Sequence, residues 1–186
     1  MSEEEKMLQG ELYFSNDDET LFFKRQTAKE LCFEYNHIRP SNLSERKHIM
    51  EKILGKIKGD FIIEQPFICD YGFNIEIGDR FYANHNLVIL DCNKVKFGDN
   101  VFIAPNCSFY TAGHPLDAKT RNQGLEYAKP IEVGNNVWIG GNVVVLPGVK
   151  IGDNSVIGAG SIVTKDIPAN VVAYGNPCRV VRNIEK

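Results

Sequence analysis

Aliphatic residues recur at every sixth position along the second half of this 186-residue chain. Positions 133, 139, 145, 151, 157 and 163 are all Val or Ile, and Gly follows at 134, 140, 152 and 158. The same frame runs through 77, 83 and 89, and again through 97, 103 and 109. A strict six-residue period fits neither an α-helix nor a β-hairpin, and it indicates a solenoid of hexapeptides.

Each hexapeptide is expected to form one flat side and one corner of a triangular coil. Three of them, about 18 residues, close one coil that rises by one strand spacing of roughly 4.8 Å. Inward aliphatic side chains then stack in columns, and Gly, Asn or Asp occupies corners that need a positive φ. The pattern predicts a mainly β chain folded as a parallel β-helix. The hexapeptide pattern resembles the left-handed form, an exception to the right-handed crossover rule.

Residues 1–60 have a different texture, with abundant Glu, Lys and Leu and with apolar positions at mixed three- and four-residue spacing. This spacing predicts short amphipathic helices that cap a larger core. Residues 41–45 after Pro40 mark a helix start, and 47–58 is the expected helix body. The chain therefore divides into a helical cap over 1–60 and a β-helix over 61–186.

The six-residue rhythm breaks at length between Tyr110 and Pro130, where TAGHPLDAKTRNQGLEYAK intervenes. We expect this loop, 110–130, to protrude from the coil. Loops of about 20 residues inside a compact fold are usually functional or disordered. A smaller slip of the frame between 89 and 97 is expected to be a short outward turn.

Composition narrows the class of protein. Hydrophobic residues make up 43% of the chain and charged residues 24%, which argues against disorder. The net charge of −3 shows no excess of basic residues of the kind that nucleic-acid binding requires. The acidic N-terminus and the lack of a long apolar stretch predict neither a signal peptide nor a membrane span. Five scattered cysteines without a CxxC pair favour a reduced cytoplasmic compartment.

The search for reactive groups leaves few candidates. The chain has four histidines, and His114 lies in the long loop. Histidine titrates near neutral pH and loops carry function, so His114 is the candidate general base. The sequence contains no GxSxG nucleophile motif and no nucleotide phosphate loop, so its glycines are expected to be structural.

Several strings resemble one family of enzymes. The stretch from NNVWIGGNVVV to NPCRVV looks like the C-terminal half of the hexapeptide-repeat sugar O-acetyltransferases. The segments FYAN at 81–84, TAGHPLD at 111–117, RNQGLEYAKPI at 121–131 and CFEYNHIRPS at 32–41 resemble the maltose and galactoside O-acetyltransferases, over nearly the whole chain. The resemblance implies transfer of acetyl from acetyl-CoA to a sugar hydroxyl without a metal. It also implies a homotrimer with sites between subunits.

The resemblance also implies roles for residues. His114 falls on the family's catalytic histidine, Asn84 on an asparagine near the reacting sugar, and Glu126 is a candidate to orient the histidine ring. A backbone N–H near Gly141 would stabilise the oxyanion. The residues that match acceptor contacts are Asp17, Arg25, Phe73, Tyr82, Asn84, Asp91 and Glu126. Those that match coenzyme A contacts are Trp138, Gly141, Ala159, Thr164, Lys165, Arg179 and Arg182. Arg179 and Arg182 would read the 3′-phosphate, with Lys165 nearer the pyrophosphate.

The sequence departs from the galactoside-type members at the acceptor site. Phe73 stands where they have a serine, and Cys92 stands where they have an acidic residue, although Asp91 lies beside it. An aromatic ring offers an apolar platform for a pyranose, which favours the maltose or glucose branch.

Two other functions fit a hexapeptide solenoid. A metal lyase of the γ-carbonic-anhydrase kind needs three histidines around zinc, and only His85 and His114 lie in the solenoid region. A non-catalytic scaffold would need neither the loop histidine nor the C-terminal arginines.

Overall fold

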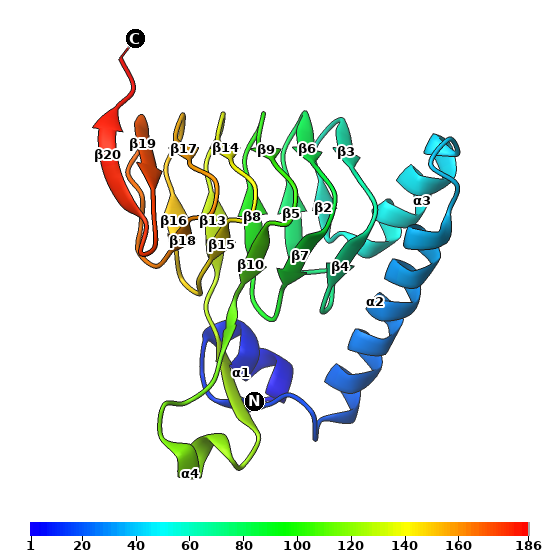
Figure 1. Ribbon diagram of the computed structural model, residues 1–186. Coiled ribbons are helices and arrows are strands. Elements are labelled where there is room, and N and C mark those ends of the chain that lie inside the picture. Colours follow the sequence, from blue (N-terminus) through cyan, green and yellow to red (C-terminus); the bar gives the residue numbers. More distant parts are fainter. Residues whose placement is uncertain (186) are drawn as a thin grey trace.

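Three sheets wind around one axis and form the sides of a triangular prism in the computed structural model, which describes residues 1–185 (Figure 1). Their strands pair in parallel, except the last strand of the chain, which is antiparallel to its neighbour. Side 1 contains β2 (Lys56–Ile57), β5 (Ile75–Ile77), β8 (Val95–Phe97), β13 (Ile131–Val133) and β16 (Lys150–Ile151). Side 2 contains β3 (Phe61–Ile63), β6 (Phe81–Ala83), β9 (Phe102–Ile103), β14 (Trp138–Ile139), β17 (Val156–Ile157), β19 (Val171–Tyr174) and β20 (Arg179–Asn183). Side 3 contains β4 (Phe67–Cys69), β7 (Leu87–Leu90), β10 (Ser108–Tyr110), β15 (Val144–Val145) and β18 (Ile162–Val163). The chain runs from side 1 to side 2 to side 3 in every coil, so the predicted parallel β-helix of hexapeptide coils is confirmed.

The six-residue frame forms the core of the prism. Ala83, Ile103, Ile139 and Ile157 lie in register on successive strands of side 2. Every residue of the frame, from 77 to 163, is at most 5% exposed. Aliphatic columns of this kind remove apolar surface from water along the whole axis, which is the main stabilising contribution in such a solenoid.

The corners differ from the expectation in which residue adopts the positive φ. Among the described residues 1–185, seven of the eight non-glycine residues with positive φ are asparagines, and the four glycines of the frame are not in this region. The frame glycines are required by close approach instead, because a Cβ at Gly152 would lie 2.5 Å from the backbone nitrogen of Ala169 in the next coil. The asparagine side chains also bond to one another, as from Asn136 Nδ2 to Asn154 Oδ1 at 2.9 Å.

Three helices precede the first coil, as the N-terminal pattern predicted. They are α1 (Glu3–Gln9), α2 (Glu19–His37) and α3 (Leu43–Ile53). Helices α2 and α3 cover the N-terminal end of the prism, whereas α1 lies apart from them beside the protruding loop (Figure 1). The expected helix over 47–58 stops at Ile53, because Leu54 is extended and the chain enters β2. No described helix is both long and apolar enough to cross a bilayer.

The long loop is an ordered hairpin. It contains β11 (Ala112–Gly113), α4 (Ala118–Arg121) and β12 (Leu125–Ala128), and it projects from the prism (Figure 1). The N-terminal strand β1 (Tyr13–Phe14) pairs with the other edge of β12, so a small three-stranded sheet forms outside the β-helix. This sheet ties the first 15 residues to the hairpin.

The frame slip between 89 and 97 is not an outward turn. Asp91, Cys92 and Asn93 are at most 5% exposed. The amide of Asn93 donates to the carbonyl oxygens of Met7 (3.1 Å) and Ala128 (3.1 Å). The extra residues therefore fill the space between the coil, α1 and the hairpin. The sequence of 89–97 alone could not predict this packing, because it depends on contacts with the distant N-terminal segment.

Candidate active site

The predicted site residues fall into two groups on opposite edges of side 3. One group lies on side 2 and on the corner that leads from side 2 to side 3: Tyr82, Asn84, Trp138, Gly141, Ala159, Arg179 and Arg182. The other lies on the corner that leads from side 3 to side 1, or in the N-terminal segment beside it: Asp17, Arg25, Phe73, Asp91, His114, Glu126, Thr164 and Lys165. A single chain therefore does not bring all of them to one place.

His114 follows β11 at the point where the hairpin leaves its paired region. Its ring Nδ1 lies 3.3 Å from the carbonyl oxygen of Leu125 on β12. A carbonyl can only accept, so Nδ1 carries the proton in this contact, and in the neutral ring Nε2 then has the free lone pair. The side chain is exposed, and its free nitrogen is available to a ligand.

Glu126 does not orient the His114 ring, contrary to the role suggested for it. Its carboxylate accepts hydrogen bonds from the Tyr13 hydroxyl (3.1 Å) and the Ser15 hydroxyl (2.7 Å). The backbone carbonyl of Leu125 takes the place of a carboxylate beside the ring. The sequence did not indicate Tyr13 and Ser15, because Leu12, Tyr13 and Phe14 form a continuous apolar run without the alternation that marks a strand with one buried face.

Asp91 is not available to an acceptor, and its predicted contact role is wrong. The residue is 0% exposed, and its carboxylate accepts from the backbone N–H groups of Asp70 (3.1 Å), Tyr71 (2.8 Å) and Asn74 (3.3 Å). Burial raises the pKa of Asp91 to about 7. Its function is to hold the corner before β5.

The carboxylate that remains reachable at this corner belongs to Asp70, which the sequence analysis did not single out. Asp70 is half-buried and accepts from the Cys92 thiol at 3.4 Å. Burial raises the pKa of Asp70. A charged residue directly before YGFN was the signal in the sequence, but only the fold shows that Asp70 and not Asp91 faces outward.

Helix α2 supplies two cations to the same corner. The Arg25 guanidinium donates to the Tyr71 hydroxyl (2.8 Å) and to Asn16 Oδ1 (3.1 Å). The Lys24 ammonium lies 5.2 Å from the centre of the Phe73 ring, so one face of that ring is engaged in a cation–π contact. Asp17 is exposed just before the helix N-cap Asp18.

The other group follows side 2. Strand pairing aligns Tyr82, Phe102, Trp138, Val156 and Val172 in one outward row that ends at Arg182. Trp138 is 57% exposed in the middle of this row. The corner positions Asn84, Gly141 and Ala159 adjoin it on three different coils. An extended ligand laid along this edge would meet an aromatic platform first and a cation last.

A β-bulge brings both C-terminal arginines to the same face. Val172 pairs with Arg182, but the next residue, Ala173, pairs with Val180, so β20 carries one extra residue. Arg179 pairs with Tyr174, and residues directly opposite each other share one face of a sheet. Ala173 points into the core at 0% exposure, so both arginines lie on the outward side.

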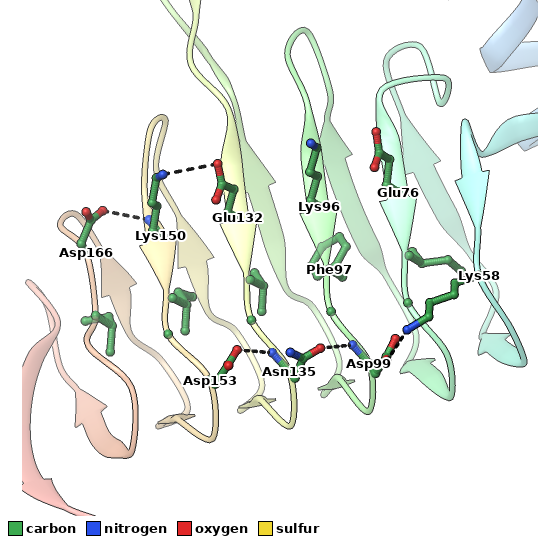
Figure 2. Close-up of a pocket in the computed structure, with 18 of the residues that line it drawn as sticks. Lys58, Glu76, Lys96, Phe97, Asp99, Glu132, Asn135, Lys150, Asp153 and Asp166 are labelled. Atoms are coloured by element: carbon green, nitrogen blue, oxygen red, sulfur yellow. Dashed lines mark hydrogen bonds and ion pairs between the residues drawn. The ribbon is translucent and has the colours of Figure 1, made fainter.

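Side 1 has a different character. Its outward row alternates in sign over Lys56, Glu76, Lys96, Glu132, Lys150 and Asp166. Figure 2 shows the side chains from Glu76 to Asp166, and Lys150 Nζ lies 3.4 Å from Glu132 Oε1. A shallow groove of about 790 Å³ runs along this side, lined by none of the predicted site residues. The opposite charges along this row compensate each other, which is typical of a solvated face.

The potential metal ligands of the described residues are dispersed. Within residues 1–185, no three His, Cys, Asp or Glu residues cluster so that they could hold a metal ion. His85 lies on the corner between sides 2 and 3, with its Nδ1 2.6 Å from the carbonyl oxygen of Gln65, and His114 lies in the hairpin. The lyase alternative therefore lacks a ligand set.

Comparison with known proteins decides the family. Residues 6–59 match the maltose acetyltransferase hexapeptide capping motif, and residues 130–165 match the bacterial transferase hexapeptide (six repeats). Galactoside O-acetyltransferase of Escherichia coli K12 is 50% identical over 97% of this chain and 88% of its own length. The chain belongs to the galactoside and maltose O-acetyltransferase family.

Solved structures of this family agree with the fold. The crystal structure of a maltose O-acetyltransferase from Clostridium difficile 630 has a TM-score of 0.97 and 49% identity, covering 100% of this chain and 99% of that one. A galactoside acetyltransferase in complex with coenzyme A has a TM-score of 0.96 and 49% identity, covering 100% of this chain and 92% of that one. This member of the family is an acetyltransferase, and acetyl-CoA is its cosubstrate.

Proposed function

We propose that this acetyltransferase transfers acetyl from acetyl-CoA to a hydroxyl of a sugar, with His114 as the general base. The contact between His114 Nδ1 and the Leu125 carbonyl carries the proposal. It supports the neutral tautomer in which Nδ1 carries the proton and Nε2 is unprotonated. An alcohol is a poor nucleophile near neutral pH, and a base of this kind removes its proton as it attacks.

The reaction follows from that proton transfer. The sugar oxygen bonds to the thioester carbon while its proton passes to His114 Nε2. The carbonyl oxygen becomes an oxyanion, for which the backbone N–H at Gly141 is the proposed donor. When the C–S bond breaks, the thiolate of coenzyme A takes the proton from His114, and the sugar acetate leaves.

We propose that the active unit is a homotrimer with its sites between neighbouring subunits. The division of the site residues between two edges of side 3 supports it, because His114 and Asn84 then meet only across an interface. The large side chains Ile62, Phe102 and Trp138 on side 2 are 51–57% exposed in one chain, a surface that a second subunit would cover.

For the donor, the outward row of side 2 supports a route for coenzyme A. Trp138, Gly141 and Ala159 would line the pantetheine arm, with Arg179 and Arg182 at the 3′-phosphate. Thr164 and Lys165 lie on the other edge of side 3, so they would reach the same molecule from the adjacent subunit. The residues fit an extended ligand with one anionic end.

For the acceptor, Asp17, Arg25, Tyr82, Asn84 and Glu126 remain the proposed contacts, and Phe73 remains the proposed selector. A half-exposed ring at this corner supports the maltose or glucose branch, because aromatic rings pack on the apolar face of a pyranose.

A panel of acceptors tests the proposed function. The purified protein is mixed with acetyl-CoA and glucose, maltose, a thiogalactoside, an amino sugar or no acceptor, and free thiol release is followed. We expect glucose or maltose to give the highest kcat/KM and an O-acetyl product by mass spectrometry. Thiol release that no sugar stimulates would overturn the proposal.

A further inference from the structure

Strand β1 and the residue that follows it contact the carboxylate of Glu126 with two hydroxyls. Tyr13 and Ser15 are 0% and 3% exposed, and their hydroxyls meet the two different oxygens of that carboxylate. Burying a hydroxyl without a partner is costly, so both contacts fix the carboxylate as well as satisfying the hydroxyls. Each carboxylate oxygen accepts more than one hydrogen bond, so Glu126 keeps capacity for a ligand.

The register of the small sheet puts these groups in one row. Ala112 pairs with Ala128 and Gly113 with Tyr127, and His114 follows the last of these pairs directly. Extending this register by one position would place His114 across from Glu126. On the other edge of β12, Tyr13 pairs with Glu126 and Phe14 with Leu125. Residues opposite each other share a face, so Glu126 and Tyr13 lie on the same face of the sheet, and the extended register puts His114 on that face as well. Strand β1 thus supports both the carboxylate and the carbonyl that holds His114.

The surroundings of Glu126 explain why it needs holding. Asp70 lies on the same corner; burial raises its pKa, and the charge of Glu126 adds to this effect. Two carboxylates near each other repel, and a free Glu side chain would turn toward solvent. Burial raises the pKa of Tyr13, with Cys92 and Glu126 contributing, which keeps Tyr13 a phenol that donates.

We propose that Tyr13 and Ser15 are positioning residues for the acceptor. They hold the Glu126 carboxylate beside His114. There the carboxylate accepts a hydrogen bond from an acceptor hydroxyl, the neighbour of the hydroxyl that reacts. The acceptor class is therefore a polyol with neighbouring hydroxyls, such as a pyranose. This inference rests on the proposed function.

The variants Tyr13→Phe and Ser15→Ala remove one hydroxyl each. We expect each to raise the KM for the best sugar of the panel roughly tenfold, with the KM for acetyl-CoA unchanged. Ser15→Thr keeps a hydroxyl and should restore the acceptor KM. Tyr35→Phe is the matched control, because Tyr35 is also buried but donates to the carbonyl of Ile63 under the α2–α3 cap. It should lower Tm without changing either KM.

A double-mutant cycle with Glu126→Ala separates positioning from general loss of structure. If the hydroxyls act through Glu126, Tyr13→Phe adds nothing to the acceptor KM in the Glu126→Ala background. Additive effects, or a wild-type KM in both single variants, would overturn the inference while leaving the proposed function intact. The same cycle in urea unfolding measures the coupling of Tyr13 to Glu126 without any acceptor, and zero coupling there would also overturn it.

Discussion

His114 Nδ1 lies 3.3 Å from the carbonyl oxygen of Leu125, so a backbone group and not a carboxylate orients the imidazole. A carbonyl fixes the tautomer as an aspartate would, but it brings no full negative charge to stabilise the imidazolium. The rigidity of β12, which is paired on both edges, then determines the position of the base.

Asp91 should make stability depend on pH. Burial raises its pKa from 3.8 to about 7, so between these values the folded state holds a proton that the unfolded chain has released. Its stabilising contribution is complete below about pH 4 and is lost as the pH rises through 7, with a slope of at most about 1.4 kcal/mol per pH unit. Asp91→Asn should flatten the free energy of unfolding between pH 5 and pH 7 in urea titrations. Equal slopes in both proteins would contradict the assignment.

Phe73 should control acceptor preference. An aromatic platform selects by shape, so we expect the native enzyme to favour glucose or maltose over a thiogalactoside by roughly 10–100-fold in kcat/KM. Phe73→Ser should narrow or reverse that preference and leave the KM for acetyl-CoA unchanged. Phe33→Ser, at an exposed ring on α2 that stacks on His37, is the control. The same ranking of sugars in the Phe73 variant would remove Phe73 as the selector.

Arg179 and Arg182 should read the 3′-phosphate of the donor. A charge-assisted contact is worth about 1.5–3 kcal/mol, so dephospho-acetyl-CoA should have a KM at least roughly tenfold higher in the native enzyme. With both arginines changed to Ala, the two donors should become nearly equal. Changing Lys56 and Lys96 on side 1 to Ala is the control for lost positive charge. A preference that survives the arginine variant places the phosphate elsewhere.

Light scattering should give a mass near three times the 20.9 kDa of one chain. Acidic residues in the outward rows of sides 2 and 3, as in the Phe102→Asp and Val144→Asp double variant, should dissociate the assembly and abolish activity. Lys96→Asp on the charged side 1 should do neither. A native monomer with full turnover would contradict a site shared between subunits.

The sequence predicted the prism because each six-residue repeat forms one side and one corner of the coil. Every inward position of the frame could be assigned, since Val and Ile at that spacing have no other common use. The corner chemistry was harder, because Gly134 and Gly152 look alike whether they adopt a positive φ or allow close backbone contact. Only packing between coils distinguishes the two.

The candidate site was less predictable where distant segments meet. The sequence indicated His114 by its loop, but the partner of its ring depends on pairing across the hairpin. The roles of Tyr13 and Ser15 depend on contacts with a residue more than 110 positions away. Asp70 and Asp91 have the same side chain, and only burial separates the structural carboxylate from the accessible one.

We propose that His114 removes the proton from the acceptor hydroxyl. The most direct test is kcat for acetyl transfer to the best sugar in His114→Ala, measured beside the affinity for acetyl-CoA and the Tm. We predict a fall in kcat of roughly 10²–10⁴, with affinity and Tm close to the native values, because the exposed ring contributes little to folding. Native turnover in the folded variant would contradict a role for His114 as the general base.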